Sequence, residues 1–150
     1  MPFVQTDYNR TQAPAIAGLV ADLEQSDIIS RTAEVDIDFG KPAVRGGADN
    51  LCRPGDGASQ RFLGISVRDV TIDPSKNPNK YSTNDTVSII RKGPIWVTAS
   101  VAVSQGDVVH YDHSNEGAWT NTSGANTTEV TNAEWDTTAG AGELAIIRLR

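Results

Sequence analysis

Residues 93–111, GPIWVTASVAVSQGDVVHY, decide the fold class of this chain. Gly93-Pro94 opens an apolar run, Gln105-Gly106-Asp107 supplies turn residues, and a second apolar run ends at Tyr111. The pattern predicts a strand, a turn and a second strand. Apart from the histidines at its end, the stretch holds no side chain suited to catalysis. It therefore predicts a scaffold and leaves open what a small β protein of this kind does.

Runs of the same character lie on both sides of this stretch. Val35, Ile37 and Phe39 alternate with Asp36 and Asp38, which is the period of a strand with one buried face. Further β-rich runs occupy residues 62–72, 87–90, 95–99, 101–103, 108–111 and 144–149. Gly, Pro, Asn and Asp lie between them, so the sequence predicts an all-β barrel or sandwich. The residues expected in the core are Phe62, Ile65, Ile95, Val97, Val101, Val103, Val108, Ile146 and Leu149.

Length and charge narrow the class of protein further. The 150 residues fit one domain. The net charge of −6 argues against a general nucleic-acid binder, which would carry a basic face. The sequence has no apolar run long enough for a spanning helix and no secretory signal at MPFVQTDYNR, so no membrane partner is expected. Cys52 is the only cysteine, which excludes an internal disulfide and suits a reducing cytosol.

The N-terminal segment has two possible structures. Ile16, Leu19, Val20 and Leu23 recur at helical spacing within residues 14–24, but the segment is short and contains Gly18. A helix and an extended arm both remain open. We expect residues 1–34 to form an N-terminal arm that contacts a neighbouring chain and residues 35–150 to form the β body, because this apolar segment is too short to be stable as a free helix.

Residues 112–143 are rich in Thr, Asn, Gly and Ser, with Trp119 and Trp135 as isolated aromatic residues. This composition predicts long surface loops anchored by two tryptophans. An alternative is that the two indoles are exposed platforms for a glycan.

The charges are unevenly distributed along the chain. Residues 22–38 hold six acidic residues against Arg31, and residues 93–147 hold seven acidic residues and neither Lys nor Arg. Residues 41–68 hold five basic residues against two acidic ones. Beyond solvated faces, this asymmetry suggests that acidic and basic segments of neighbouring protomers meet.

Candidates for chemistry are few. His110, Asp112 and His113 form the only metal-like cluster, and a third well-placed ligand is not evident. Asp36 and Asp38 could form a carboxylate pair of the glycosidase type. The usual nucleophile, phosphate-loop and zinc motifs are absent from the sequence. We therefore expect that the protein is not an enzyme and that it binds no metal and no cofactor. An enzyme that uses the carboxylates of Asp36 and Asp38 is the alternative.

Two longer stretches suggest a family. AGLVADLEQSDIISRTAEVDIDFGKPAVRGG at residues 17–47 is followed by RFLGISVRDVT at 61–71, and the chain closes with ELAIIRLR. In order and spacing these elements resemble the structural cement, or capsid decoration, proteins of tailed bacteriophages. Pro42 and the Asn/Thr-rich residues 114–138 depart from the family pattern and affect loop contacts more than the fold.

The resemblance implies a compact β-barrel or jelly-roll-like body with extended arms on the outside of a capsid. The implied partners are the major capsid protein and the chain itself, as a dimer or trimer. The implied location is the outer surface of the virion, after synthesis in the cytoplasm of the bacterial host. A receptor- or glycan-binding module of the head-fibre kind is the alternative function.

The candidate residues for contact with the capsid or with a neighbouring protomer are chosen from features of the sequence and not from the resemblance. The apolar residues of the N-terminal segment are candidates because the segment is too short to be stable as a free helix. The arginines are candidates because they cluster in a Gly-rich region of an acidic protein. These residues are Ile16, Leu19, Val20, Leu23, Arg45, Arg53 and Arg61.

Overall fold

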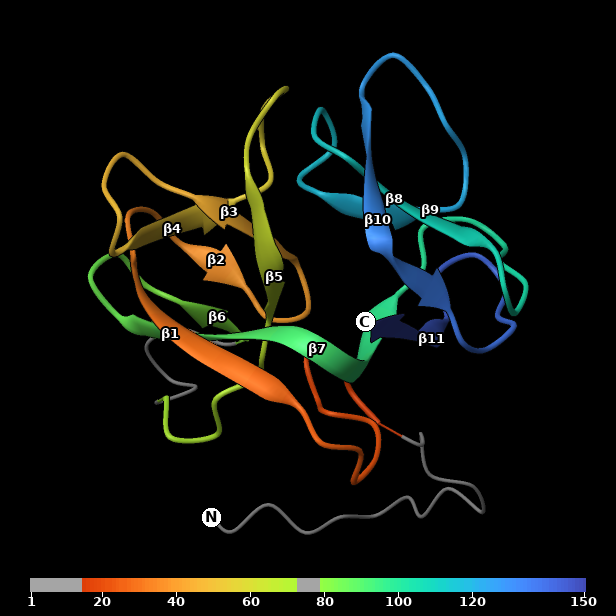
Figure 1. The fold of residues 1–150 in the computed structure, drawn as a ribbon, viewed down its shortest axis with the longest axis horizontal. Coiled ribbons are helices and arrows are strands. Elements are labelled where there is room, and N and C mark those ends of the chain that lie inside the picture. Colours follow the sequence, from red (N-terminus) through yellow and green to blue (C-terminus); the bar gives the residue numbers. More distant parts are fainter. Residues whose placement is uncertain (1–14, 73–78) are drawn as a thin grey trace, which may run out of the picture.

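A computed structural model describes residues 15–72 and 79–150 of the chain (Figure 1). It confirms the all-β class: eleven strands are present, and no helix occurs in these two ranges. The strands are β1 (Asp27–Ala33), β2 (Ile37–Asp38), β3 (Pro42–Arg45), β4 (Leu51–Pro54), β5 (Phe62–Ser66), β6 (Lys80–Tyr81), β7 (Thr86–Thr98), β8 (Val108–Asp112), β9 (Ala118–Thr120), β10 (Thr127–Trp135) and β11 (Leu144–Leu149).

Five strands close into a barrel in the N-terminal half. The sheet order β1-β4-β3-β5-β7 is completed by pairing of β1 with β7, so the five strands form a ring. Antiparallel pairing of β1 and β7 runs from Asp27 opposite Lys92 to Thr32 opposite Thr86. The short pair β2–β6 forms a separate sheet beside this barrel.

The same sheet continues into the C-terminal half in the order β7-β11-β10-β8-β9. Strand β7 belongs to both halves: its first part pairs with β1 and β5, and its second part pairs with β11. In Figure 1 it runs from the barrel on one side to the β8–β11 layer on the other. The 13 residues of β7 therefore join the two halves into one body.

A bend at Gly93 allows β7 to serve both halves. The sequence predicts two strands here, at 87–90 and 95–99, but the structure has one strand through both. Gly93 has a φ of +119°, a conformation that residues with a Cβ atom rarely adopt. A Cβ atom at this position would also lie 2.6 Å from the Ser26 Oγ atom. Glycine thus bends the strand where a turn was expected.

The core has two parts, and the larger one extends over both halves. Ile95, Val97 and Leu149 lie in the larger cluster, as predicted, together with Ile65 and Val103. The smaller cluster lies in the N-terminal half and includes Ile89 of the barrel strand β7, together with Ile37 and Tyr81 of the β2–β6 pair.

Two predicted core residues, Val108 and Ile146, lie on the other face of their strands. Val108 is 48% exposed, whereas its neighbour Val109 is fully buried. Ile146 is half-buried between the buried residues Ala145 and Ile147. Because side chains alternate along a strand, a shift of one residue exchanges the buried and exposed faces. Phe62 and Val101 are also half-buried and pack against the core.

The described part of the N-terminal segment is not a helix. Gly18 has a φ of +90°, and its N–H donates to the carbonyl of Trp96 at 2.8 Å. Val20 forms an isolated bridge with Ile95. Residues 15–21 therefore lie along β7, and β1, which the sequence places in the arm, is a barrel strand because it completes the ring. Residues 1–14 lie outside the described ranges.

Residues 112–143 contain strands as well as loops. The sequence predicts loops throughout, but β9 and β10 lie in this region, with β10 paired to both β8 and β11. Trp119 and Trp135 are 1% and 0% exposed. The indole Nε1 of Trp119 donates to the carbonyl of Gly40 at 2.7 Å. Both tryptophans anchor the fold, and neither can serve as an exposed platform.

Cys52 gives a prediction about pH. Its side chain is fully buried in β4, and burial raises the pKa of the thiol from 9.0 to about 11. We expect the native protein at pH 8 to resist a thiol reagent that labels the urea-unfolded chain at once.

The same shift links folding to pH. Between about pH 9 and 11 the unfolded thiol loses its proton before the folded one, so the free energy of unfolding should fall by roughly 2 kcal/mol across this window. A Cys52→Val variant lacks this component and serves as the control in pH-dependent urea titrations. Rapid labelling of the folded protein would contradict the burial of Cys52.

Candidate functional site

Two β-bulges lie on β5 and β7, which are neighbouring strands of the barrel. On β7, Lys92 pairs with Asp27 and Ile90 pairs with Ile28, so Arg91 is an extra residue. On β5, Leu63 is skipped in the same way in the pairing with β3. A bulge re-aims side chains that would otherwise alternate between faces. As a result, Arg91 with Lys92, and Phe62 with Leu63, line the same hollow.

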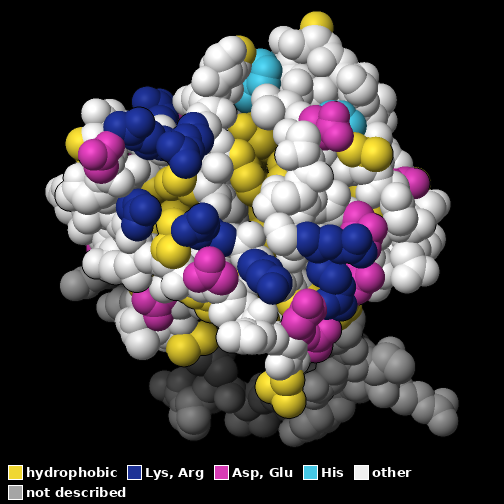
Figure 2. All heavy atoms as spheres, viewed as in Figure 1, with side chains coloured by type: hydrophobic (Ala, Val, Ile, Leu, Met, Phe, Trp, Pro, Cys, Tyr) yellow, Lys and Arg dark blue, Asp and Glu magenta, His cyan; other side chains and the backbone are white. Residues whose placement is uncertain are grey.

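This hollow, which we call the basic groove, has a volume of about 570 Å³. Its side chains come from several strands and from the segments beside them. They include six cations and two carboxylates, which gives a net charge of +4 on a chain whose total is −6. The lining residues are Asp27, Ile29, Arg31, Arg45, Asp49, Arg61, Phe62, Leu63, Arg91, Lys92, Asn132 and Arg150. Figure 2 shows Lys and Arg side chains spread across this face, with hydrophobic side chains visible between them.

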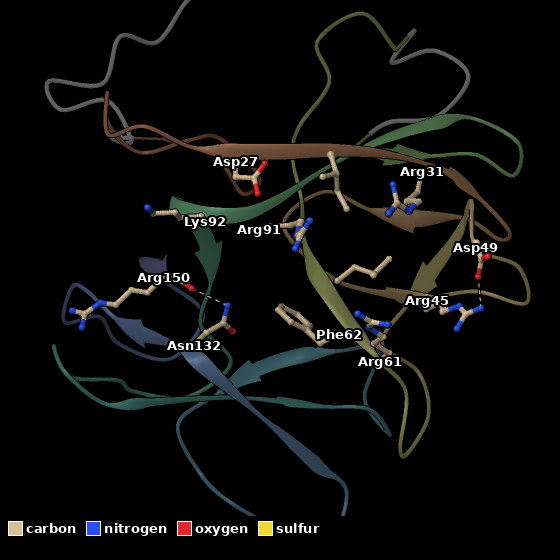
Figure 3. Close-up of a pocket in the computed structure, with 12 residues that line it drawn as sticks. Asp27, Arg31, Arg45, Asp49, Arg61, Phe62, Arg91, Lys92, Asn132 and Arg150 are labelled. Atoms are coloured by element: carbon tan, nitrogen blue, oxygen red, sulfur yellow. Dashed lines mark hydrogen bonds and ion pairs between the residues drawn. The ribbon is translucent and has the colours of Figure 1, made fainter.

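The middle of the basic groove is lined by arginine and apolar side chains. Figure 3 shows Arg91, from β7, and Arg61 near Phe62 on β5. Phe62 is stacked on Tyr111, with ring centroids 6.0 Å apart, so its position is fixed by the core. The middle of the groove is therefore a preformed surface with a partly apolar floor.

The two ends of the basic groove are also cationic. Arg45 and Asp49 lie toward one end in Figure 3, while Lys92 and Arg150 lie toward the other. Arg45 forms an ion pair with Asp49, and Arg150 forms one with Glu134. These pairs hold the end cations in place without cancelling the charge of the middle.

Three cations of the basic groove are free to meet a partner. Within the described residues, the side chains of Arg61, Arg91 and Lys92 form no ion pair, and all three residues are exposed. Unpaired guanidinium groups bind carboxylates through two parallel hydrogen bonds. The groove can therefore bind anionic groups from another molecule.

The structure separates the three arginines that the sequence singled out. Arg45 and Arg61 line the basic groove, but Arg53 is absent from its lining and forms an ion pair with Asp56 at 2.9 Å. This ion pair raises the pKa of Arg53 and contributes to lowering that of Asp56. Sequence reasoning did not single out Arg91 and Lys92. These residues reach the groove through a bulge, and a bulge is defined by the pairing of strands that are distant in the sequence.

The apolar candidates of the N-terminal segment divide into two pairs. Leu23 is fully exposed and Ile16 is 46% exposed. Leu19 and Val20 are half-buried, and Val20 packs against the larger core cluster. Leu23 and Ile16 are therefore available for contact, whereas Leu19 and Val20 partly serve to attach the segment to β7.

The other candidates for chemistry lack the required geometry. In the described ranges no group of three or more His, Cys, Asp or Glu side chains could hold a metal ion. The carboxylate of Asp112 accepts hydrogen bonds from the backbone and hydroxyl of Ser114, at 2.9 and 2.6 Å. A hydrogen bond from Lys80 at 3.1 Å helps lower the pKa of Asp36, which makes this carboxyl unsuitable as a general acid.

The described part of the chain also holds no helix long and apolar enough to cross a membrane.

The fold defines a small all-β protein with a basic groove on its surface. A family model for the structural cement protein (E217 gp24/Pam3 gp6) matches residues 4–150. The chain therefore belongs to the phage structural cement protein family. This family is a structural class and not a class of enzymes.

Solved structures show the same fold. A chain from "The capsid of Myoviridae Phage XM1" superposes with a TM-score of 0.80 at 21% identity, covering 99% of this chain and 97% of that one. A chain from "The crystal structure of head fiber gp8.5 N base in bacteriophage phi29" gives a TM-score of 0.51 at 11% identity, covering 84% and 95%. No curated protein sequence matches the chain.

Proposed function

We propose that this protein binds the outer surface of an assembled phage capsid across neighbouring major capsid subunits and stabilises the head. The match of the cement family along residues 4–150 is the observation that carries this proposal. The structure supports it with a body of two joined halves, an exposed apolar segment and a basic groove. A protein that acts by binding to the capsid surface needs no reactive centre.

The proposal extends to assembly and location. The protein is made in the cytoplasm of the bacterial host and joins the outside of the head, where its copies associate as dimers or trimers. Closed symmetric contacts are the commonest arrangement among identical chains. A footprint that spans two or more capsid subunits would exist only after the shell has reached its final form.

Binding to heads tests this function directly. The purified protein is mixed with empty heads in the expanded and the unexpanded form, and the bound fraction is measured by co-sedimentation. We expect saturable binding to expanded heads and little binding to unexpanded ones. Absence of binding to both forms would reject the proposal.

A substitution at Leu23 should separate binding from folding. Leu23 is fully exposed, so Leu23→Ser should change the free energy of unfolding by less than about 0.5 kcal/mol. If the segment contacts the shell, the same change should weaken head binding about tenfold through the loss of one buried leucine. Val70→Ser is the matched control, because Val70 is 82% exposed and lies outside the N-terminal segment. Equal binding of both variants and the wild type would remove Leu23 from the contact surface.

The glycan-binding alternative has lost its main support. It depended on Trp119 and Trp135 as exposed aromatic platforms, and both side chains are buried. The likeness to the head-fibre structure concerns the fold alone.

A further inference from the structure

We propose that the basic groove binds an extended, carboxylate-rich segment of the shell protein. This inference rests on the proposed function and names the chemistry of the partner at one site. It places the primary polar contact at Arg61 and Arg91, in the middle of the groove, and gives the partner's apolar side chains a place on the floor beside them.

Charge selects the class of ligand. The lining of the groove carries a net charge of +4, while the whole chain carries −6. A local potential opposite to that of the surrounding surface favours and orients an anionic partner. Arg61 and Arg91 have no ion-pair partner among the described residues, so a carboxylate meeting them would displace no internal ion pair.

The floor and rim favour a polypeptide over a nucleic acid. Ile29, Phe62 and Leu63 contribute apolar surface between the cations, which suits an apolar side chain flanked by carboxylates. Asp27 and Asp49 also line the groove and would repel a continuous phosphate backbone. A polypeptide can place its carboxylates at the cations and neutral groups beside these two acidic residues.

The chain's own acidic residues are largely engaged, which argues against a second copy as the occupant. Asp22 forms an ion pair with Arg148 at 3.3 Å, and Glu24 pairs with the same arginine. Glu134 pairs with Arg150, and the Asp107 carboxylate accepts hydrogen bonds from Asn121 and from the backbone of Ser104. A second copy would have to break such contacts to supply a cluster of carboxylates.

Paired neutralisations test the groove on heads. Arg61→Gln/Arg91→Gln removes two exposed groove cations, and Lys41→Gln/Lys80→Gln removes two cations outside the lining with the same change in net charge. In co-sedimentation with expanded heads, we expect the half-saturating concentration of the groove variant to rise at least about tenfold, and that of the control to stay within about twofold. Raising the salt concentration should weaken wild-type binding more than binding of the groove variant, because the contact is screened.

A second measurement keeps the inference separate from the proposed function. A fluorescein-labelled ten-residue oligoglutamate peptide is titrated with each free protein at low salt, and its anisotropy is recorded. The wild type and the control should bind it at least about tenfold more tightly than the groove variant. A ten-nucleotide oligothymidylate, titrated in the same way, should bind more weakly than the peptide.

The outcomes distinguish the two ideas. If the wild type binds heads and the groove variant binds equally well, the groove inference is wrong and the capsid function stands. If no protein binds heads but the peptide shows the expected pattern, the groove binds acidic polypeptide and the capsid function fails. Tighter binding of oligothymidylate than of peptide, or cross-linking of one copy to the groove of another on the head, would overturn the proposed occupant.

Discussion

Replacing Trp119 with alanine should lower the free energy of unfolding by about 3–5 kcal/mol, the range for a fully buried large aromatic residue. Trp119 is 1% exposed and packs edge-on against Tyr111, with ring centroids 6.1 Å apart. Its Nε1 atom also donates to the carbonyl of Gly40, so the indole ties β9 to the segment after β2. Loss of the ring leaves a cavity where the two halves of the body meet.

Urea titration of the wild type, Trp119→Ala and Trp119→Phe measures this effect. The phenylalanine variant keeps much of the packing and loses the hydrogen bond to Gly40, so its loss should be smaller, at about 1–3 kcal/mol. If Trp119→Ala were as stable as the wild type but lost binding to a glycan array, the indole would be a surface platform, and the receptor-binding alternative would be favoured.

The fold class was predictable because strand signals are local. The apolar run at 108–111 and turn residues such as Gln105-Gly106-Asp107 depend only on neighbouring positions. The alternation at Val35, Ile37 and Phe39 was a weaker signal, because of these three residues only Ile37 lies in a strand and Val35 is 38% exposed. The continuous strand through Gly93-Pro94 was not predictable, because this dipeptide is also typical of a turn. Only the pairing of β7 with strands on both sides shows that the chain bends there and continues.

Burial was harder to predict than strand position. Val108 and Val109 are chemically identical, and their order on the two faces depends on pairing with β10. Trp119 in a polar region has no sequence signal that separates an anchor from a platform. Its buried position is fixed by a hydrogen bond to the carbonyl of Gly40, which lies 79 positions away in the sequence.

The sequence predicted three contact arginines but no groove. Arg45, Arg53 and Arg61 were singled out because they cluster within a Gly-rich region of an acidic chain, and only Arg45 and Arg61 line the groove. Arg91 and Lys92 reach the same groove through a bulge opposite Asp27, and a bulge is a property of two paired strands. The arginine cluster was therefore visible in the sequence, whereas its completion depended on the closed barrel.

If the protein binds heads as proposed, we expect stabilisation of the head to be the larger effect, because it is repeated over many sites. A protein that binds the assembled shell but not its free subunits adds about 2.7 kcal/mol per site at a hundredfold excess over Kd. In the proposed arrangement, each contact across a seam between capsid subunits would oppose the outward pressure of packaged DNA. We expect heads without this protein to lose their DNA at a lower temperature than decorated heads, or on chelation of polyvalent cations.

The cement function is tested most directly by the temperature at which DNA-filled heads release DNA, with and without this protein. DNA release is followed by the fluorescence of an intercalating dye during heating. We expect a higher release temperature for decorated heads, and recovery of that temperature when purified protein is added back to bare heads. Equal release temperatures for decorated and bare heads would contradict the cement function.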